Sequence, residues 1–161
     1  MRYEIIDNFL DKDIFINLKN VLESNKIPWY YTDEVVRNDK KYNTFYFTHM
    51  LFVNNNIDSN LFELMQPILE KLDCKALIRI KANLYTNMGS YIEDPKHTDY
   101  PYSHKGALFY INTNDAPTIL DDGTKIEAIE NRLLKFDPSL IHNSSHPTDK
   151  DRRITINFNY M

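Results

Sequence analysis

The sequence predicts an α+β domain that is mainly β, in which N-terminal helices cover one face of a β-sandwich or barrel. Apolar residues recur at helical spacing only in the first half of the chain. From Leu77 onward the apolar residues alternate with polar ones, as in strands that bury one face. The 161 residues, 42% of them hydrophobic, are enough for one domain with its own core. We therefore expect a single domain over residues 1–161, with a helical support region at 1–75 and the β core, which carries the site, at 76–161.

The first half of the chain contains two predicted helices and the strands around them. Tyr3 to Ile6 is predicted to be a short strand, and Asp11 is the expected N-cap of the helix after it. Between the helices, Thr44 to Val53 is rich in aromatic and β-branched residues and predicts one or two strands. Pro67 lies inside the second helical pattern and predicts a kink or a later helix start. The apolar helical positions are Ile14, Phe15, Leu18, Val21 and Leu22 in the first helix and Leu61, Leu64, Met65, Ile68, Leu69 and Leu72 in the second.

The second half is predicted to consist of strands. The strand that begins at Leu77 has an apolar face and a polar face, and the polar face carries Arg79, Lys81, Asn83 and Tyr85. The chain has only 3 glycines, so its turns are expected to rely on Asn and Asp, and Asp122-Gly123 is a tight-turn signal. The further predicted strands are Ala107 to Asn112, Lys125 to Ala128, Leu133 to Phe136 and Arg153 to Tyr160.

Composition and charge restrict the class of function. The net charge of −4 disfavours a broad basic surface and therefore nucleic acid as a partner. Cys74 is the only cysteine, so no internal disulfide can form and a reducing cytoplasm is the expected location. We find no signal-peptide pattern and no apolar run long enough to cross a bilayer, so no membrane partner is expected.

His97-Thr98-Asp99 is the first part of a predicted metal site. On a strand, residues two apart point to the same face, so the imidazole and the carboxylate can reach one ion. His142, which follows a predicted strand, is the best candidate for the third ligand. Two histidines and one carboxylate form the facial triad of non-heme Fe(II) oxygenases, which leaves coordination positions open, although Mn or Zn would accept the same ligands. Alone, the His-x-Asp motif is also common in ordinary surface turns.

Arg153 supplies the second part of the predicted site. It begins the last predicted strand and shares one face of it with Thr155 and Asn157. A buried guanidinium needs an anion, and a dicarboxylate cosubstrate offers a bidentate partner. The alternative is a surface arginine beside Arg152, which points to the other face and receives no role.

Three polar side chains are placed to hydrogen-bond a carboxylate in the same region. Asn83 and Tyr85 lie on the polar face of the strand before His97, and Tyr110 lies on the strand after Asp99. Each tyrosine is equally well explained as a core aromatic residue whose hydroxyl has a partner.

From Asn83 to Tyr160 the sequence resembles the Fe(II)/2-oxoglutarate dioxygenases of the prolyl-4-hydroxylase-like branch, and phage and bacterial members are the most similar. The matching segments are NLY, HTD, LFYIN, DDGTKI, NRLLKFDPSLIH and RRITINFNY, and IIDNFLDKDIF resembles the opening strand and helix of that family. The resemblance implies a double-stranded β-helix (a jelly roll, cupin-like), with two facing four-stranded sheets and helices against one of them. It weakens between Asn25 and Cys74. Where the family often has a Gly-Gly pair, this chain has Asn114-Asp115-Ala116-Pro117, which puts the loop geometry there in question.

The resemblance implies a complete set of site residues. His97, Asp99 and His142 would bind Fe(II). The distal carboxylate of 2-oxoglutarate would pair with Arg153, helped by Thr155 and Tyr110, and the residues near its iron-chelating end would be Tyr85 and Asn83. With O2, such a site hydroxylates a C–H bond of a peptidyl (prolyl-type) or small-molecule substrate while 2-oxoglutarate is decarboxylated to succinate and CO2. If the chain is phage-encoded, the host cytoplasm is its expected location.

Other histidines of the chain are alternatives for the same site. His146 is a rival third ligand, but FDPSLIH matches the family's Phe-Asp-x-x-x-x-His pattern and favours His142, so His146 is expected in a loop at the pocket rim. His49 and His104 have no local partner pattern and are expected to be structural or surface residues. A substrate contact for His104, which follows Tyr100 and Tyr102, is the alternative.

Competing functions differ from this interpretation at identifiable positions. Nucleic-acid oxidative demethylases share the Asn-x-Tyr and His-x-Asp elements but usually carry a second arginine where this chain has Asn159. Halogenating relatives lack the carboxylate ligand, and Asp99 is present. A non-catalytic metal-binding β-helix domain would usually have lost a ligand or the cosubstrate arginine. The polar Tyr31 to Tyr42 segment is either a lid over the pocket or a surface loop. The fold and the metal triad together do not specify which substrate the site would take.

Overall fold

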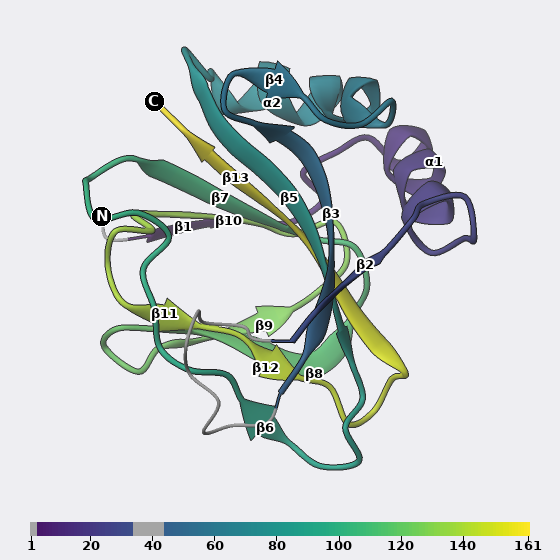
Figure 1. The fold of residues 1–161 in the computed structure, drawn as a ribbon, viewed down its shortest axis with the longest axis vertical. Helices are drawn as coiled ribbons and strands as arrows, with labels where there is room; N and C mark the ends of the chain where they lie inside the picture. Colours follow the sequence, from purple (N-terminus) through teal and green to yellow (C-terminus); the bar gives the residue numbers. More distant parts are fainter. Residues whose placement is uncertain (1–2, 34–43) are drawn as a thin grey trace.

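The computed structural model describes residues 3–33 and 44–161 and shows two β layers, with helices outside one of them (Figure 1). The larger layer is an eight-stranded sheet in which β13 (Arg152–Tyr160) lies between β5 (Leu77–Thr86) and β7 (Lys105–Tyr110). All of its neighbouring strands pair antiparallel. The order continues from β7 to β10 (Leu133–Phe136) and β1 (Tyr3–Ile6), and from β5 to β3 (Tyr46–Val53), which pairs with both β2 (Tyr30–Thr32) and β4 (Asn56–Ile57).

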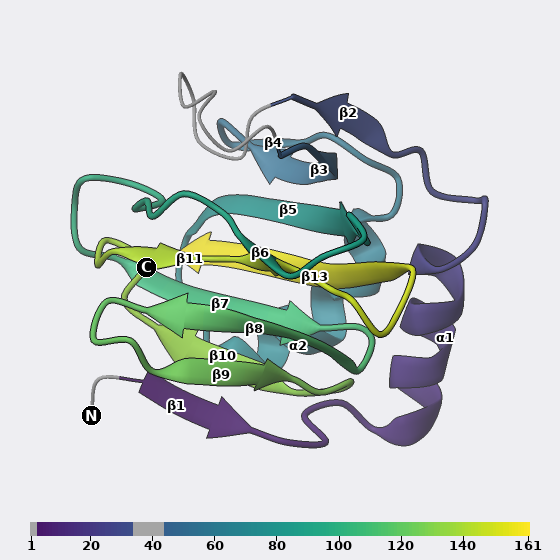
Figure 2. The same ribbon diagram turned by 90° about the horizontal axis from the view of Figure 1, so that it is seen from below.

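The smaller layer faces the central strands of the large sheet (Figures 1 and 2). Its three-stranded part has β8 (Asn114–Leu120) between β9 (Lys125–Ala128) and β11 (His142–Asn143), and its two-stranded part pairs β12 (Ser145–His146) with β6 (Ile92–Glu93). This is the predicted mainly β, jelly-roll arrangement. It differs from two four-stranded sheets because strands of the N-terminal region extend both edges of the large sheet, while the smaller layer is divided into two parts.

The helices pack on the outer face of the large sheet, as the apolar patterns predict. Helix α1 (Lys12–Leu22) follows Asp11 and buries Phe15, Leu18 and Leu22. The second helical segment begins as a short 3-10 helix, η2 (Phe62–Met65), and continues as α2 (Gln66–Leu72) with Pro67 in its first turn, where a missing N–H costs nothing. The core under the helices includes the apolar face of β13, with Ile154, Ile156, Phe158 and Tyr160 all buried. The helices therefore fix the outer face of the strand whose inner face carries Arg153.

Turns of this chain use asparagine and aspartate in the left-handed conformation, as the scarcity of glycine predicts. Among the residues that the structure describes, the non-glycine residues with positive φ are Asn8, Asn54, Asn55, Asp73 and Asn131. Asn131 does more than turn the chain, because its side chain donates to the Leu10 carbonyl (2.8 Å) and accepts from the Leu10 amide (2.9 Å). It thereby joins the turn before β10 to the segment before α1.

Three expectations about local structure were wrong. Asn114 to Pro117, expected to be a loop, begins strand β8, and a register shift between Asn114 and Thr118 accommodates the proline, which has no N–H for the ladder. His146, expected in a loop at the pocket rim, lies on the short strand β12, and His142 lies on the short strand β11. His97-Thr98-Asp99 is not on a regular strand, since His97 forms one isolated antiparallel bridge with His142. The proposed lid falls mostly outside the described residues, which omit 34–43.

Candidate active site

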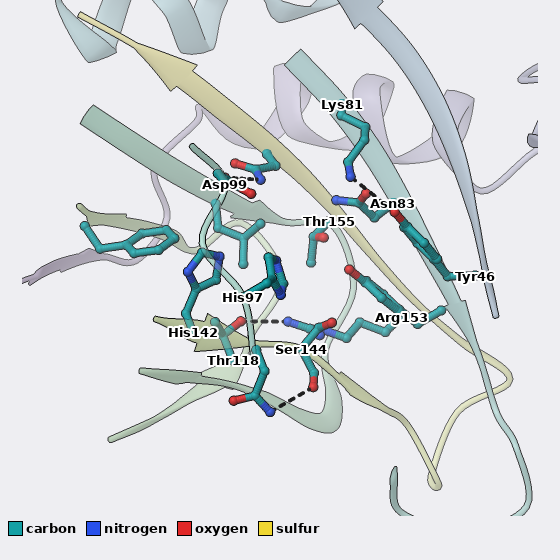
Figure 3. Close-up of a pocket in the computed structure, with 15 residues that line it drawn as sticks. Tyr46, Lys81, Asn83, His97, Asp99, Thr118, His142, Ser144, Arg153 and Thr155 are labelled. Carbon is teal, nitrogen blue, oxygen red and sulfur yellow. Dashed lines mark hydrogen bonds between the residues drawn. The ribbon is translucent and has the colours of Figure 1, made fainter. Parts of the chain in front are cut away.

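The site lies between the two layers, on the polar faces of β5 and β13. Because the two strands pair antiparallel, each inward residue of β5 lies directly opposite an inward residue of β13, and we call each such cross-strand pair a rung. The successive rungs are Arg153 with Tyr85, Thr155 with Asn83, Asn157 with Lys81, and Asn159 with Arg79. The cavity above them has a volume of about 490 Å³ including its mouth (Figure 3). It is lined by Tyr46, Lys81, Asn83, Tyr85, His97, Asp99, Leu108, Thr118, Phe136, His142, Asn143, Ser144, Arg153, Thr155 and Asn157.

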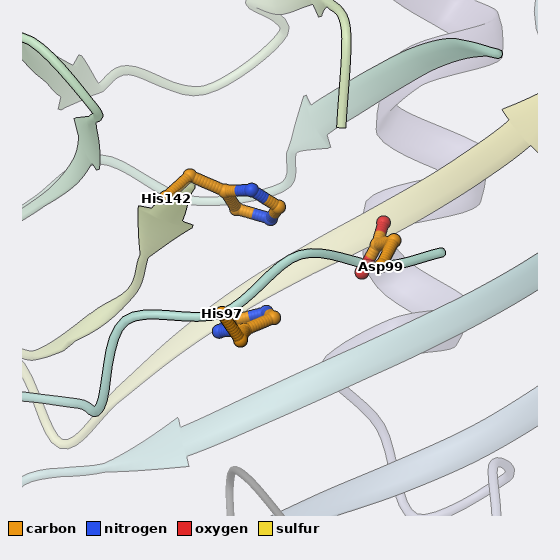
Figure 4. A group of neighbouring side chains, drawn as sticks. All are labelled: His97, Asp99 and His142. Carbon is orange, nitrogen blue, oxygen red and sulfur yellow. The ribbon is translucent and has the colours of Figure 1, made fainter. Parts of the chain in front are cut away.

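Backbone hydrogen bonds bring the three predicted metal ligands together. The His97 amide donates to the His142 carbonyl and the His142 amide to the His97 carbonyl, both at 2.9 Å. The Asp99 amide donates to the Pro138 carbonyl, also at 2.9 Å. As a result, one ligand atom from each of His97, Asp99 and His142 lies within 4.8 Å of the others (Figure 4). The structure thus brings together the three residues that the sequence analysis selected.

Both histidines present the same nitrogen to the common centre. His97 Nδ1 lies 3.2 Å from the Pro95 carbonyl, and His142 Nδ1 lies 2.9 Å from the Leu140 carbonyl. A carbonyl can only accept, so each Nδ1 carries the hydrogen and each Nε2 keeps its lone pair for an ion. Burial, assisted by nearby His142, lowers the pKa of His97 to about 4, so its imidazole is neutral at neutral pH. Neutral imidazole is the form that binds metals.

Asp99 is held in its ionised form by polar neighbours. Its Oδ2 accepts hydrogen bonds from the side-chain amides of Asn157 (2.9 Å) and Asn159 (2.8 Å), and Arg79 Nη2 lies 3.1 Å from Oδ1. Burial alone would raise the pKa of Asp99, but the Arg79 guanidinium and the two amides lower it well below its ordinary value. A carboxylate has about four acceptor positions, so these contacts leave room for an ion. Two imidazole nitrogens and this carboxylate fit Fe(II).

The sequence pattern does not identify two of these Asp99 partners. It places Arg79 on the polar face of its strand without a role, and it marks Asn159 only as a position without arginine. Their common signal is the rung that they share, which becomes visible only when the register of β5 against β13 is known. Asn159 Nδ2 also lies 3.1 Å from His104 Nε2, so His104 supports Asp99 through Asn159.

Arg153 is buried at the other end of the pocket, with 1% of its surface exposed. Its Nη2 donates to Thr118 Oγ1 (2.7 Å) and its Nη1 to the Ser145 carbonyl (3.2 Å). In the described part of the chain, its Nε has no hydrogen-bond partner and no carboxylate forms an ion pair with it. Since a buried charge is stable only when it is paired, this guanidinium fits an anionic ligand.

Aromatic rings hold the guanidinium in place. The Arg153 Cζ atom lies 5.3 Å from the ring centre of Tyr85 and 5.8 Å from that of Tyr110. Tyr110 does not line the cavity, and its hydroxyl donates to Thr118 Oγ1 (2.8 Å), which also accepts from Arg153. Tyr85 stacks on Tyr46 at 5.3 Å, and burial raises the pKa of its hydroxyl. Tyr110 therefore contacts Arg153 and its partner Thr118, whereas Tyr85 reaches the cavity itself.

Other predicted residues also lie where a ligand can meet them. Thr155 and Asn83 share a rung in the middle of the cavity wall. The side-chain carbonyls of Asn83, Asn143 and Asn157 are buried, and none has a hydrogen-bond partner in residues 3–33 and 44–161. Buried polar atoms without partners are rare in proteins, so these three indicate polar groups or water that a filled pocket would contain.

The remaining histidines are structural. His146, expected at the pocket rim, is fully buried, so that expectation was wrong. Its Nε2 lies 3.1 Å from Asp94 Oδ1 and its Nδ1 lies 2.9 Å from the Thr86 carbonyl. Burial opposes protonation, but the hydrogen bond and charge of Asp94 raise the pKa of His146 above its ordinary value. His49 is bonded to the Pro28 carbonyl and to Ser59, in agreement with its predicted structural role.

Solved structures with the same fold were found by comparison. A viral collagen prolyl hydroxylase from Paramecium bursaria Chlorella virus-1, in complex with 2OG, superposes with a TM-score of 0.63 at 15% identity, over 99% of this chain and 95% of that one. A 2OG-Fe(II) oxygenase family oxidoreductase from Burkholderia pseudomallei gives 0.74 at 8% identity, over 99% and 84%. A prolyl hydroxylase from Trichoplax adhaerens, in complex with a hypoxia-inducible factor peptide fragment, gives 0.69 at 15% identity, over 99% and 83%. These likenesses show that the chain has the predicted jelly-roll fold.

Sequence comparison adds no closer relative, since no family model and no curated protein matches the chain. Among the described residues, no helix is long and apolar enough to cross a membrane.

Proposed function

We propose that this protein is an Fe(II)- and 2-oxoglutarate-dependent oxygenase that hydroxylates a C–H bond of its substrate. The observation that carries the proposal is one pocket with two features. At one end, the ligand atoms of His97, Asp99 and His142 lie within 4.8 Å of one another, and at the other end the Arg153 guanidinium is buried without a carboxylate partner in the described residues. The solved oxygenase structures with the same fold support it.

In this proposal, residues at one end of the pocket bind the metal and residues at the other end bind the cosubstrate. His97, Asp99 and His142 would hold Fe(II) and leave positions open for the cosubstrate and oxygen. Arg153 and Thr155 would bind the distal carboxylate of 2-oxoglutarate, and Tyr85 and Asn83 would line its path to the metal. When bound, iron and 2-oxoglutarate supply the oxidising chemistry, in which O2 is consumed and succinate, CO2 and the hydroxylated substrate are formed.

The protein's own contribution is positioning. The neutral His97 imidazole and the ionised Asp99 need no proton rearrangement to accept a divalent ion. Asn157, Asn159 and Arg79 fix the carboxylate, so that its geometry is set before the ion arrives. The solved relatives include enzymes that act on prolyl residues, which supports a peptidyl, prolyl-type substrate, and a small molecule is the alternative.

The described contacts argue against a demethylase. The second arginine of that group would stand at Asn159, and here the Asn159 amide is bonded to Asp99 and His104. A non-catalytic β-helix domain would not need the whole triad and the buried arginine in one cavity.

Anaerobic titration with Fe(II) and 2-oxoglutarate, followed by visible absorption, tests the proposal. Chelation of ferrous iron by the keto acid gives a weak band in the visible region, and we expect this band with the wild-type protein. His142→Ala should abolish it, whereas His49→Gln, which changes a histidine outside the pocket, should retain it in the folded protein. If the folded wild-type protein binds iron but forms no band, the proposed cosubstrate is wrong.

A further inference from the structure

Lys81 places a second cation on the cavity wall, away from Arg153. It lies on the inward face of β5, two rungs from Tyr85, which faces Arg153 across the strands. At the rise of a strand, four residues separate the two rungs by about 13 Å. Figure 3 shows the Lys81 amine turned into the cavity toward Asn83 and Tyr46. The pocket therefore has cationic groups at two separate places on its wall.

The Lys81 ammonium has no anionic partner in the described part of the chain. The ammonium donates a hydrogen bond to the Tyr46 hydroxyl at 3.3 Å, and its nitrogen lies 5.4 Å from the centre of the Tyr46 ring. The carboxylate of the pocket, Asp99, is already bonded to Asn157 and Asn159 and paired with Arg79. A partly buried ammonium with only neutral contacts costs free energy unless a ligand supplies the negative charge.

We propose that Lys81 is the substrate-recognition cation of this pocket and that it binds a carboxylate of the substrate. The inference rests on the proposed function and deepens it by assigning the chemical class of the substrate. The two carboxylates of 2-oxoglutarate are accounted for by Arg153 and by the metal centre. The positive charge of the filled site would still exceed its negative charge. The positive groups are Fe(II), Arg79, Lys81 and Arg153, and the negative groups are Asp99 and the two carboxylates of 2-oxoglutarate. The filled site therefore attracts an additional anion.

The surroundings of Lys81 favour a carboxylate over a more highly charged anion. The neighbouring Arg79 guanidinium is already paired with Asp99, so the Lys81 ammonium and the Tyr46 hydroxyl are left to suit one singly charged group, whereas phosphate sites usually assemble several cationic or backbone donors. Burial and the neighbouring Arg79 guanidinium lower the pKa of Lys81 to about 8, so most of the ammonium remains charged at neutral pH. The carboxylate can belong to a free amino acid or to an acidic side chain of a peptide.

Acetate is the probe that tests the site without knowledge of the substrate. We would load the protein anaerobically with Fe(II) and saturating 2-oxoglutarate, confirm the visible band, and measure acetate binding by calorimetry and by its effect on that band. Lys81→Met preserves most of the side-chain volume and should weaken acetate binding at least tenfold while the affinity for 2-oxoglutarate stays within twofold. Lys75→Met, which changes an exposed lysine outside the pocket, is the matched control and should bind acetate like the wild type.

The two sources of the carboxylate are separated with matched pairs of ligands. N-acetyl-L-proline against its amide represents a terminal carboxylate, and acetyl-Glu-Pro-amide against acetyl-Gln-Pro-amide represents a side-chain carboxylate. In the wild-type protein, the charged member of one pair should bind at least tenfold more tightly than the neutral member. In Lys81→Met, this preference for the charged member should be lost.

The outcomes separate this inference from the proposed function. Absence of the visible band in the wild-type protein overturns both. If the band forms but acetate binds equally to the wild type and to Lys81→Met, or to neither, the inference about Lys81 is wrong and the oxygenase proposal stands. A tenfold loss of 2-oxoglutarate affinity in Lys81→Met, with acetate binding unchanged, would assign Lys81 to the cosubstrate instead.

Discussion

Arg152 and Arg153 show how one residue of offset decides the role of a side chain. Arg153 points into the cavity and is 1% exposed, while the Arg152 guanidinium reaches the other side and donates to the Glu23 carbonyl at 3.3 Å. Two identical side chains in adjacent positions thus meet opposite environments, because successive residues of a strand face opposite sides of the sheet.

This pair provides a matched test of cosubstrate binding. We expect Arg153→Met to weaken 2-oxoglutarate binding by about 100-fold or more, since a charge-assisted bidentate contact contributes about 3 kcal/mol. Arg152→Met should change the affinity less than about threefold, because a partly exposed contact contributes little. Calorimetric titration of the Fe(II)-loaded variants with 2-oxoglutarate measures both effects. Equal losses in the two variants would show that Arg153 has no specific role.

The Asp94–His146 pair gives the protein a pH-dependent component of stability. Both imidazole nitrogens face acceptors, the Asp94 carboxylate and the Thr86 carbonyl, so the protonated form satisfies both contacts. The pKa of His146 is raised in the folded protein. The stabilisation is therefore complete below the unfolded pKa of about 6.5 and is lost as the pH rises through the folded pKa.

Urea unfolding of the metal-free protein between pH 6 and pH 9 measures this component. His97 and Lys81, whose pKa values are lowered in the folded protein, add a pH dependence of opposite sign to the wild type and to His146→Gln alike. His146→Gln should be destabilised at pH 6 by about 3 kcal/mol, because it leaves Asp94 buried without a cation, and this difference from the wild type should shrink as the pH rises. A difference that stays constant from pH 6 to pH 9 would show that His146 is not the titrating group.

At the scale of elements, the loop before β11 is held in place because the backbone of Gly106 in β7 lies very close to the Pro138 side chain. A Cβ atom on Gly106 in β7 would lie 2.6 Å from Pro138 Cγ and 2.7 Å from its Cδ. The Pro138 carbonyl in turn accepts the hydrogen bond of the Asp99 amide. Packing of β7 against Pro138 thus fixes the segment that joins Asp99 to the approach of His142.

We expect Gly106→Ala to destabilise the fold by about 1–3 kcal/mol through overpacking and to weaken Fe(II) binding as the loop shifts. Most of the loss should disappear in the background of Pro138→Ala, which removes the two closest atoms. Chemical unfolding and metal titration of the two single variants and the double variant give the coupling. Additive effects would mean that the contact with Pro138 is not the cause.

The whole molecule should become more stable when its site is filled, because the ligand atoms come from segments that meet only in the folded chain. At a ligand concentration about 100 times the dissociation constant, binding adds about 2.7 kcal/mol to the free energy of unfolding. For a domain of this size, the corresponding rise of Tm is about 5–10 °C.

Thermal unfolding with Fe(II) and 2-oxoglutarate under nitrogen checks this expectation. EDTA should reverse the rise, and Asp99→Ala should not show it, whereas Arg152→Met should behave like the wild type. The same rise in Asp99→Ala would place the stabilising metal elsewhere.

Much of the fold was predictable because it depends on local pattern. The strand over residues 3–6, the helix after Asp11 and the strands near residues 46–53, 77–86 and 152–160 follow from the spacing of apolar residues. Strand β8 was not predicted, since Asn114 to Pro117 has the composition of a loop and the shift that accommodates Pro117 is a property of its pairing. The two-residue strands β11 and β12 are too short to produce a pattern.

By itself, the sequence determined the two-layer class of the fold, the side of the last strand on which Arg153 lies, and the choice of His97, Asp99 and His142. Each follows from the period of a strand or from a motif within a few residues. Only the tertiary structure decided that His97 pairs directly with His142, that Arg79 and Asn159 hold Asp99, that His146 is buried on Asp94, and that Lys81 lacks an anion in the described residues. The reason is physical: these contacts join segments far apart in the chain, and their partners are set by strand register, which only the packed sheet specifies.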